Sequence, residues 1–118
     1  MNLQRGMIVI ASARDPSGKP RPFLVLRSNL FIEHDLVALL AFTTTIIDAV
    51  PLRITVQPDA TNGLRLPSQA MIDHLQAMRV QRIGGIIGQL AAADMQAIDR
   101  AVAVYLGFAD MRRRASAT

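Results

Sequence analysis

The chain has 118 residues, of which 51% are apolar, 19% charged and 4% aromatic, and its formal net charge is +4. This length suits one domain, and so high an apolar fraction excludes a disordered chain. No cysteine is present, which excludes disulfides and zinc–thiolate sites, and two histidines are too few for a three-histidine metal site. The few aromatic residues argue against RNA-binding domains that stack bases on aromatic rings.

Arginine dominates the basic residues, since twelve of the thirteen are arginine and the exception is Lys19. Guanidinium groups pair with phosphates and carboxylates, so this bias favours an anionic partner. Arg112, Arg113 and Arg114 lie in a terminal segment, 111–118, that we expect to be a disordered tail behind a single domain at 1–110. The N-terminus has no signal-like segment and no window is long enough to span a membrane, so we expect a cytoplasmic protein.

The first half of the chain predicts three strands separated by polar loops. The strands are expected at residues 7–13, 22–27 and 36–42, and the loops at 14–20 and 28–35. Residues 23–26 and 36–42 are apolar at every position, which is typical of strands buried on both faces.

The second half begins with more strands. Residues 51–56 alternate, with Leu52, Ile54 and Val56 facing inward, as in a half-exposed strand. A turn is expected at 59–63, and three further short strands are expected at 68–72, 77–80 and 84–89.

The last segment changes to a helical period. Met95, Ile98, Val102 and Leu106 fall on one face of a helix, Asp94 lies in its first turn, and Gly107 suits the position after its end. The neighbouring Tyr105 and Phe108 are interpreted as packing the helix onto the sheet. Many short strands followed by one helix predict a mainly β fold, a small bent barrel with a C-terminal helix.

Arg21 stands between Pro20 and Pro22, directly before an apolar strand. The two prolines restrict the local backbone and hold Arg21 in an extended conformation. A rigidly held cation suits contact with a phosphate or a developing negative charge. The alternative is a solvated turn residue whose prolines merely end the loop.

Several kinds of catalytic site are excluded by the sequence. No glycine-rich phosphate loop opens a helix, and neither Ser17 nor Ser68 has the strand–turn–helix setting of a nucleophilic serine. Arginine, threonine hydroxyls and the pair Asp73–His74 remain. These groups suffice for RNA cleavage without a metal, because the ribose 2′-hydroxyl is itself the nucleophile.

Five segments resemble motifs of the MazF/PemK toxin family, in the family's order. The segments are residues 5–9 (RGMIV, resembling RGDIV), 21–26 (RPFLVL, resembling RPALVL), 41–44 (AFTT, resembling P-x-T-[ST]), 71–74 (MIDH, resembling V-D-Q) and 87–90 (IGQL, resembling IGRL). Together they span most of the chain.

The resemblance implies a toxin of a type II toxin–antitoxin pair, with an SH3-like β-barrel that forms a homodimer. It further implies an endoribonuclease that cleaves single-stranded RNA, needs no cofactor and binds a cognate antitoxin. By this resemblance Arg21 and Thr43 are catalytic, and Asp73 matches an aspartate that some relatives use. We add His74 as an acid–base partner of Asp73, because a nearby carboxylate favours a protonated imidazole.

Departures from the family motifs leave two alternatives open. The loop at 14–20 is shorter than in the family and has no glutamate, and Met7, Ala41 and His74 replace the usual Asp, Pro and Gln. The first alternative is a CcdB-like poison of DNA gyrase, because residues 105–108 resemble the aromatic-Gly-apolar ending of those toxins. The second is an inactive relative that retains only antitoxin binding.

Overall fold

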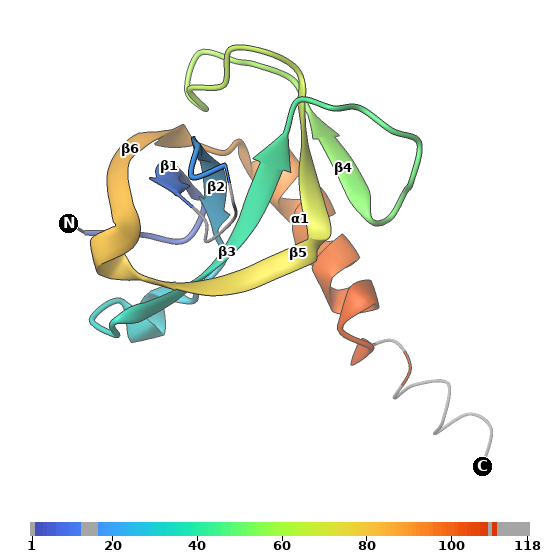
Figure 1. Ribbon diagram of the computed structural model, residues 1–118. Helices are drawn as coiled ribbons and strands as arrows, with labels where there is room; N and C mark the ends of the chain where they lie inside the picture. The colour runs from blue at the N-terminus through green and yellow to red at the C-terminus, as the bar shows by residue number, and fades with distance from the viewer. Residues whose placement is uncertain (1, 13–16, 109, 111–118) are drawn as a thin grey trace.

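The computed structural model describes residues 2–12, 17–108 and 110. Six strands form one antiparallel sheet with the order β4-β5-β3-β2-β1-β6, and a helix follows them (Figure 1). The elements are β1 (Met7–Ser12), β2 (Pro20–Val25), β3 (Leu36–Thr43), β4 (Arg53–Val56), β5 (Ser68–Arg79), β6 (Ile83–Gln89) and α1 (Ala92–Tyr105), with short 3-10 helices at Asn29–Phe31 and Val80–Arg82. The predicted mainly β fold with a C-terminal helix is confirmed. The expected tail at 111–118 and part of the loop expected at 14–20 lie outside the described residues.

The strongest departure from the predicted elements is β5. The segments 68–72 and 77–80, expected as two strands, belong to one strand of 12 residues that curves across the sheet (Figure 1). Leu40 pairs with Leu75 while Phe42 pairs with Ala70, so residues 71–74 stand opposite Ala41 alone. This irregularity bends β5 without ending it, and the first half of the strand also pairs with β4.

Strands β1 to β3 contribute to two separate cores, because alternate side chains point to opposite faces of the sheet. Val9, Phe23 and Leu39 belong to one core, whereas Ile8, Leu24 and Leu40 belong to the other, and all six are 0% exposed. Leu24 and Leu40 pair across β2 and β3. The expectation that the apolar runs 23–26 and 36–42 are buried on both faces is therefore confirmed for most of their length.

Helix α1 closes the second core with Ile98 and Ala101. Asp94 lies in its first turn, and Gly107 adopts a φ of +85° immediately past its end, as predicted. Asp99 fastens the helix to the N-terminal segment through Arg5, whose Nη2 lies 2.5 Å from the carboxylate. No helix in the described part of the chain is long and apolar enough to cross a membrane.

The interpretation of the end of α1 was wrong. Tyr105 and Phe108 are 48% and 61% exposed, so they do not pack the helix onto the sheet. Helix α1 packs on β4 and β5, and its last turn continues past the edge of the sheet (Figure 1). Side chains beyond that edge have no strand to cover them.

The loop between β4 and β5 is fastened to β6, at the opposite edge of the sheet. Gln89 donates a backbone hydrogen bond of 2.9 Å to the Thr61 carbonyl. A Cβ atom on Gly88 would overlap the backbone of Thr61 and Asn62, so only glycine allows so close an approach. The two edges of the sheet are thus joined by a loop contact, whereas β4 and β6 do not pair with each other in the described part of the chain, so the expected barrel is not closed.

Candidate functional site

Arg21 and Thr43 come from neighbouring strands and line the same pocket. Phe23 of β2 pairs with Ala41 of β3, and Arg21 and Thr43 each lie two residues beyond this pair, at the same end of the two strands. Arg21 itself lies within β2 and pairs with Ala11 of β1, so it is a strand residue and not a residue of the preceding loop. The pocket has a volume of about 330 Å³. Its lining residues are Arg21, Pro22, Phe42, Thr43, Thr44 and Thr45.

We call this pocket the Arg21 pocket, and a local hydrogen bond holds the Thr43 hydroxyl in place within it. The Thr43 hydroxyl oxygen accepts a hydrogen bond of 3.1 Å from the backbone N–H of Thr45. Its own proton remains available to donate to a ligand, because a hydroxyl group can accept and donate at once. The buried Gln69 side chain supports the following loop by bonding both backbone groups of Ile47, at 3.1 and 2.9 Å.

Asp73 and His74 form a second polar group with Arg53 and do not line the Arg21 pocket. The Nη1 atom of Arg53 donates a hydrogen bond of 2.6 Å to Oδ1 of Asp73, and Nε2 of His74 lies 3.9 Å from the same oxygen. The irregular stretch 71–74 of β5 allows these successive side chains to approach one another. The structure thus brings Arg21 to Thr43, and Asp73 to His74.

Arg53 changes the chemistry of Asp73. Desolvation acts to raise the pKa of the Asp73 carboxyl, but the hydrogen bond from Arg53, a backbone hydrogen bond and nearby positive charge outweigh it and lower the pKa. Asp73 is therefore a carboxylate at neutral pH. Sequence reasoning missed Arg53, although its outward position in the alternating segment 51–56 was a signal that the side chain faces away from the core.

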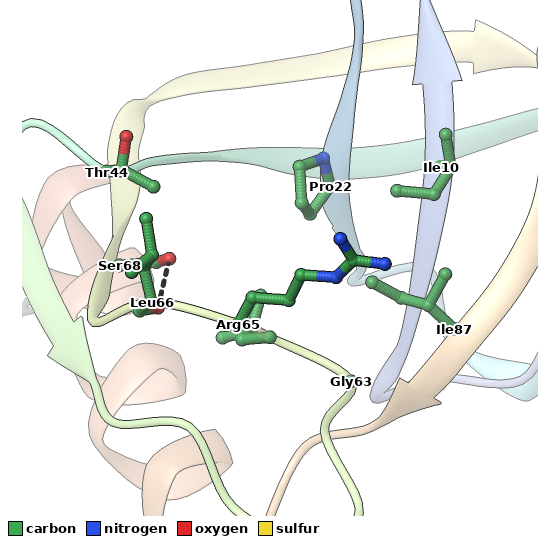
Figure 2. A pocket seen from close by; sticks show the side chains of 9 residues that line it. Ile10, Pro22, Thr44, Gly63, Arg65, Leu66, Ser68 and Ile87 are labelled. Atoms are coloured by element: carbon green, nitrogen blue, oxygen red, sulfur yellow. Dashed lines mark hydrogen bonds between the residues drawn. The ribbon is translucent and has the colours of Figure 1, made fainter.

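A larger pocket adjoins the Arg21 pocket and shares Pro22 and Thr44 with it (Figure 2). Its volume is about 400 Å³. We call it the Arg65 pocket; it is lined by Ile10, Pro22, Thr44, Gly63, Leu64, Arg65, Leu66, Ser68 and Ile87. Sequence reasoning also missed Arg65, whose only signal was a lone charge between Leu64 and Leu66. Among residues 2–12, 17–108 and 110, no three His, Cys, Asp or Glu side chains gather as metal ligands.

Comparison with known families identifies the family to which the chain belongs. A family model described as the PemK-like, MazF-like toxin of type II toxin–antitoxin systems matches residues 4–106. The chain belongs to this family. The match covers all five motifs, including the segments that carry Arg21 and Thr43.

Relatives of this family member agree with the assignment. A probable endoribonuclease MazF from Mycolicibacterium smegmatis is 38% identical over 108 residues, which cover 91% of this chain and 99% of the relative. The structure of the Mycobacterium tuberculosis toxin MazF-mt6 superposes with a TM-score of 0.69 at 31% identity, covering 82% of this chain and 92% of that toxin. A mycobacterial endoribonuclease solved with its cognate antitoxin gives a TM-score of 0.74 at 23% identity, with coverages of 89% and 95%, and supports the fold alone.

Proposed function

We propose that this PemK/MazF-family toxin is an endoribonuclease that cleaves single-stranded RNA at the Arg21 pocket. The observation that carries the proposal is the meeting of Arg21 and Thr43 in one pocket, on adjacent strands. The named MazF relatives favour this activity over a CcdB-like poison of gyrase. We propose that it acts in the cytoplasm, where its RNA substrate is found.

The reaction needs a cation and a hydrogen-bond donor over the scissile phosphate. The ribose 2′-oxygen forms a bond to phosphorus while the bond from phosphorus to the 5′-oxygen breaks, which leaves a 2′,3′-cyclic phosphate and a 5′-hydroxyl group. The Arg21 guanidinium stabilises the negative charge that accumulates on the phosphate oxygens, and the Thr43 hydroxyl donates a hydrogen bond to one of them. Both groups stand on paired strands, so they need little reorganisation when the substrate binds.

The proton released by the 2′-hydroxyl must end on the departing 5′-oxygen. Asp73 and His74 are our candidates for this transfer, and neither of them lines the Arg21 pocket. Asp73 is ionised at neutral pH, the form that accepts a proton, although its lowered pKa makes it a weak base. Water is the alternative proton carrier. Replacing His74 distinguishes transfer by His74 from transfer by water.

The activity is tested by incubating the purified toxin with a long RNA in the presence of EDTA. We expect discrete fragments with 2′,3′-cyclic phosphate ends, undiminished by the chelator, because the proposed chemistry uses only side chains of this protein. The Arg21→Ala variant, prepared in parallel, controls for contaminating ribonuclease. A strict requirement for Mg²⁺ would contradict the proposed mechanism, and growth arrest with inhibited gyrase and intact RNA would contradict the activity.

The partners of the toxin are proposed on the same basis. Since a related endoribonuclease has been solved with its cognate antitoxin, we propose that this chain also binds an antitoxin. From the family resemblance we further propose that it forms a homodimer. An acidic antitoxin segment would neutralise Arg21 by occupying the contacts that a phosphate needs. Native mass spectrometry of the toxin, alone and with the product of the adjacent gene, should show a dimer and a stable complex. A folded monomer that binds no antitoxin would contradict both proposals.

A further inference from the structure

The Arg65 pocket continues the Arg21 pocket along the surface. Pro22 and Thr44 line both, so the Arg65 pocket lies directly beside a phosphate that contacts Arg21 and Thr43. The walls of the Arg65 pocket are mostly apolar and include Ile10, Leu64 and Ile87. Such walls suit the flat face of a nucleobase, which is apolar whatever the base.

Arg65 is held on a tightly anchored backbone. Two residues before it, Gly63 adopts a φ of +73° and lies directly against the carbonyl of Ile87 in β6. Asn62 is fully buried, and its side chain accepts a hydrogen bond of 3.0 Å from Leu64 and donates one of 2.9 Å to Gln57. Contacts with Ile87 and Gln57 therefore anchor the backbone next to Arg65, whose side chain is exposed.

The Arg65 guanidinium is a cation without a partner among the residues that the structure describes. Arg5 and Arg53 pair with Asp99 and Asp73, whereas within the described part of the chain Arg65 makes no hydrogen bond and no ion pair. Figure 2 shows its guanidinium reaching across the pocket toward Pro22 and Ile87. A guanidinium beside apolar surface, with no competing carboxylate, is well suited to bind a phosphate bidentately.

We propose that Arg65 is a positioning residue that binds an RNA phosphate neighbouring the scissile one, while the Arg65 pocket receives the base of an adjoining nucleotide. The inference rests on the proposed ribonuclease function and adds a second phosphate contact to it. Arg21 acts on the phosphate that reacts; Arg65 holds the strand in register. Replacing Arg65 should thus weaken substrate binding more than it slows the chemical step.

The test compares Arg65→Gln with Arg100→Gln. Arg100 is exposed on α1 and lines neither pocket, so its variant makes the same change in net charge at another place. Cleavage sites of the wild-type toxin are mapped first, and an oligonucleotide of that sequence is made uncleavable by a single 2′-deoxy substitution. We expect Arg65→Gln to raise Kd and KM for RNA about tenfold with kcat little changed. The slope of the logarithm of the association constant against the logarithm of the salt concentration should become shallower by about 0.7. Arg65→Lys should recover part of the affinity.

Neutral methylphosphonates, introduced at one phosphate at a time, identify the contact without relying on the variant. One substitution beside the scissile phosphate should weaken binding by the wild type and by Arg100→Gln, but not by Arg65→Gln. If the wild type neither binds nor cleaves RNA, the proposed function itself fails. If it cleaves RNA while Arg65→Gln behaves as Arg100→Gln at every phosphate, only the present inference is overturned. Normal RNA binding by Arg65→Gln with a weakened antitoxin complex would equally overturn it, by assigning the pocket to the antitoxin.

Discussion

Asp73 of β5 and Arg53 of β4 form an ion pair across the two strands, with 2.6 Å between Oδ1 and Nη1. Arg53 pairs with Met71 in the sheet, so its side chain leans along β5 to reach Asp73. The Arg53 side chain is 15% exposed and that of Asp73 is 33% exposed. A largely buried guanidinium thus has a half-buried counter-ion.

The Arg53–Asp73 pair predicts a pH-dependent stability. Because the folded-state pKa of Asp73 lies below its ordinary value of 3.8, the pair stabilises the fold above that value and this contribution is lost as the pH falls through the folded-state pKa. The Asp73→Asn variant should therefore be less stable than the wild type at pH 7, by roughly 0.2–1 kcal/mol for a partly exposed pair. Melting curves from pH 7 to pH 3 should show the difference shrinking below about pH 4. An equal difference in stability between the two proteins at pH 7 and at pH 3 would contradict this prediction.

Replacing Arg21 should remove most of the activity while leaving the fold intact. Loss of one donor to a transition-state charge typically costs about 10²–10³-fold in rate. Arg21→Ala should show this loss in kcat, and Arg21→Lys should remain impaired because the planar fork is absent. Circular dichroism and the melting temperature check the fold, with Arg100→Ala as the matched control. An Arg21→Ala variant that is folded and fully active would exclude Arg21 from catalysis.

Thr43 can be examined with a pair of conservative changes. Thr43→Val keeps the shape of the side chain but removes the hydroxyl, and we expect about 10²-fold slower cleavage. Thr43→Ser retains the hydroxyl, so it should keep most of the rate. Single-turnover cleavage of the mapped substrate separates the chemical step from binding. Equal rates for the Val and Ser variants would mean that the hydroxyl takes no part.

His74 is tested by the pH profile of kcat. If His74 transfers the proton, His74→Gln should change the shape of the pH profile of kcat, because an acid–base group is then missing from the reaction. Glutamine preserves hydrogen bonding near Asp73, so a structural role alone would leave the shape of the profile unchanged. Profiles that superimpose after scaling would assign the proton transfer to other groups.

Gly88 and Gly85, on the same strand, offer a matched test of the loop contact with β6. A Cβ atom at Gly88 meets the backbone of Asn62, whereas at Gly85 nothing lies within 4 Å. Gly88→Ala should therefore cost about 1–3 kcal/mol in the free energy of unfolding, the usual range for overpacking, and Gly85→Ala should cost little. Urea titrations measure both. Because the same loop carries Arg65, Gly88→Ala should also raise KM for RNA. If Gly88→Ala and Gly85→Ala had equal free energies of unfolding, the loop would have shifted to accommodate the added methyl group.

Local patterns in the sequence were sufficient for much of the fold. The apolar runs before and after residue 30 predicted β2 and β3, because a strand buried on both faces needs apolar side chains at every position. The period of Met95, Ile98 and Val102 likewise predicted α1. Short segments that resemble family motifs led to Arg21 and Thr43. Each of these signals is contained within a few consecutive residues.

Only the tertiary structure decided which distant residues meet. The irregular register of β5 against β3 made one strand of two expected ones, and the pairing of β4 with β5 brought Arg53 to Asp73. The contact of the β4–β5 loop with Gly88 brought Arg65 into a pocket beside Pro22. Sheet register and loop closure depend on the packing of the whole domain, and no local pattern of side chains specifies them. For the same reason the exposure of Phe108 followed from where the sheet ends and not from the apolar character of the residue.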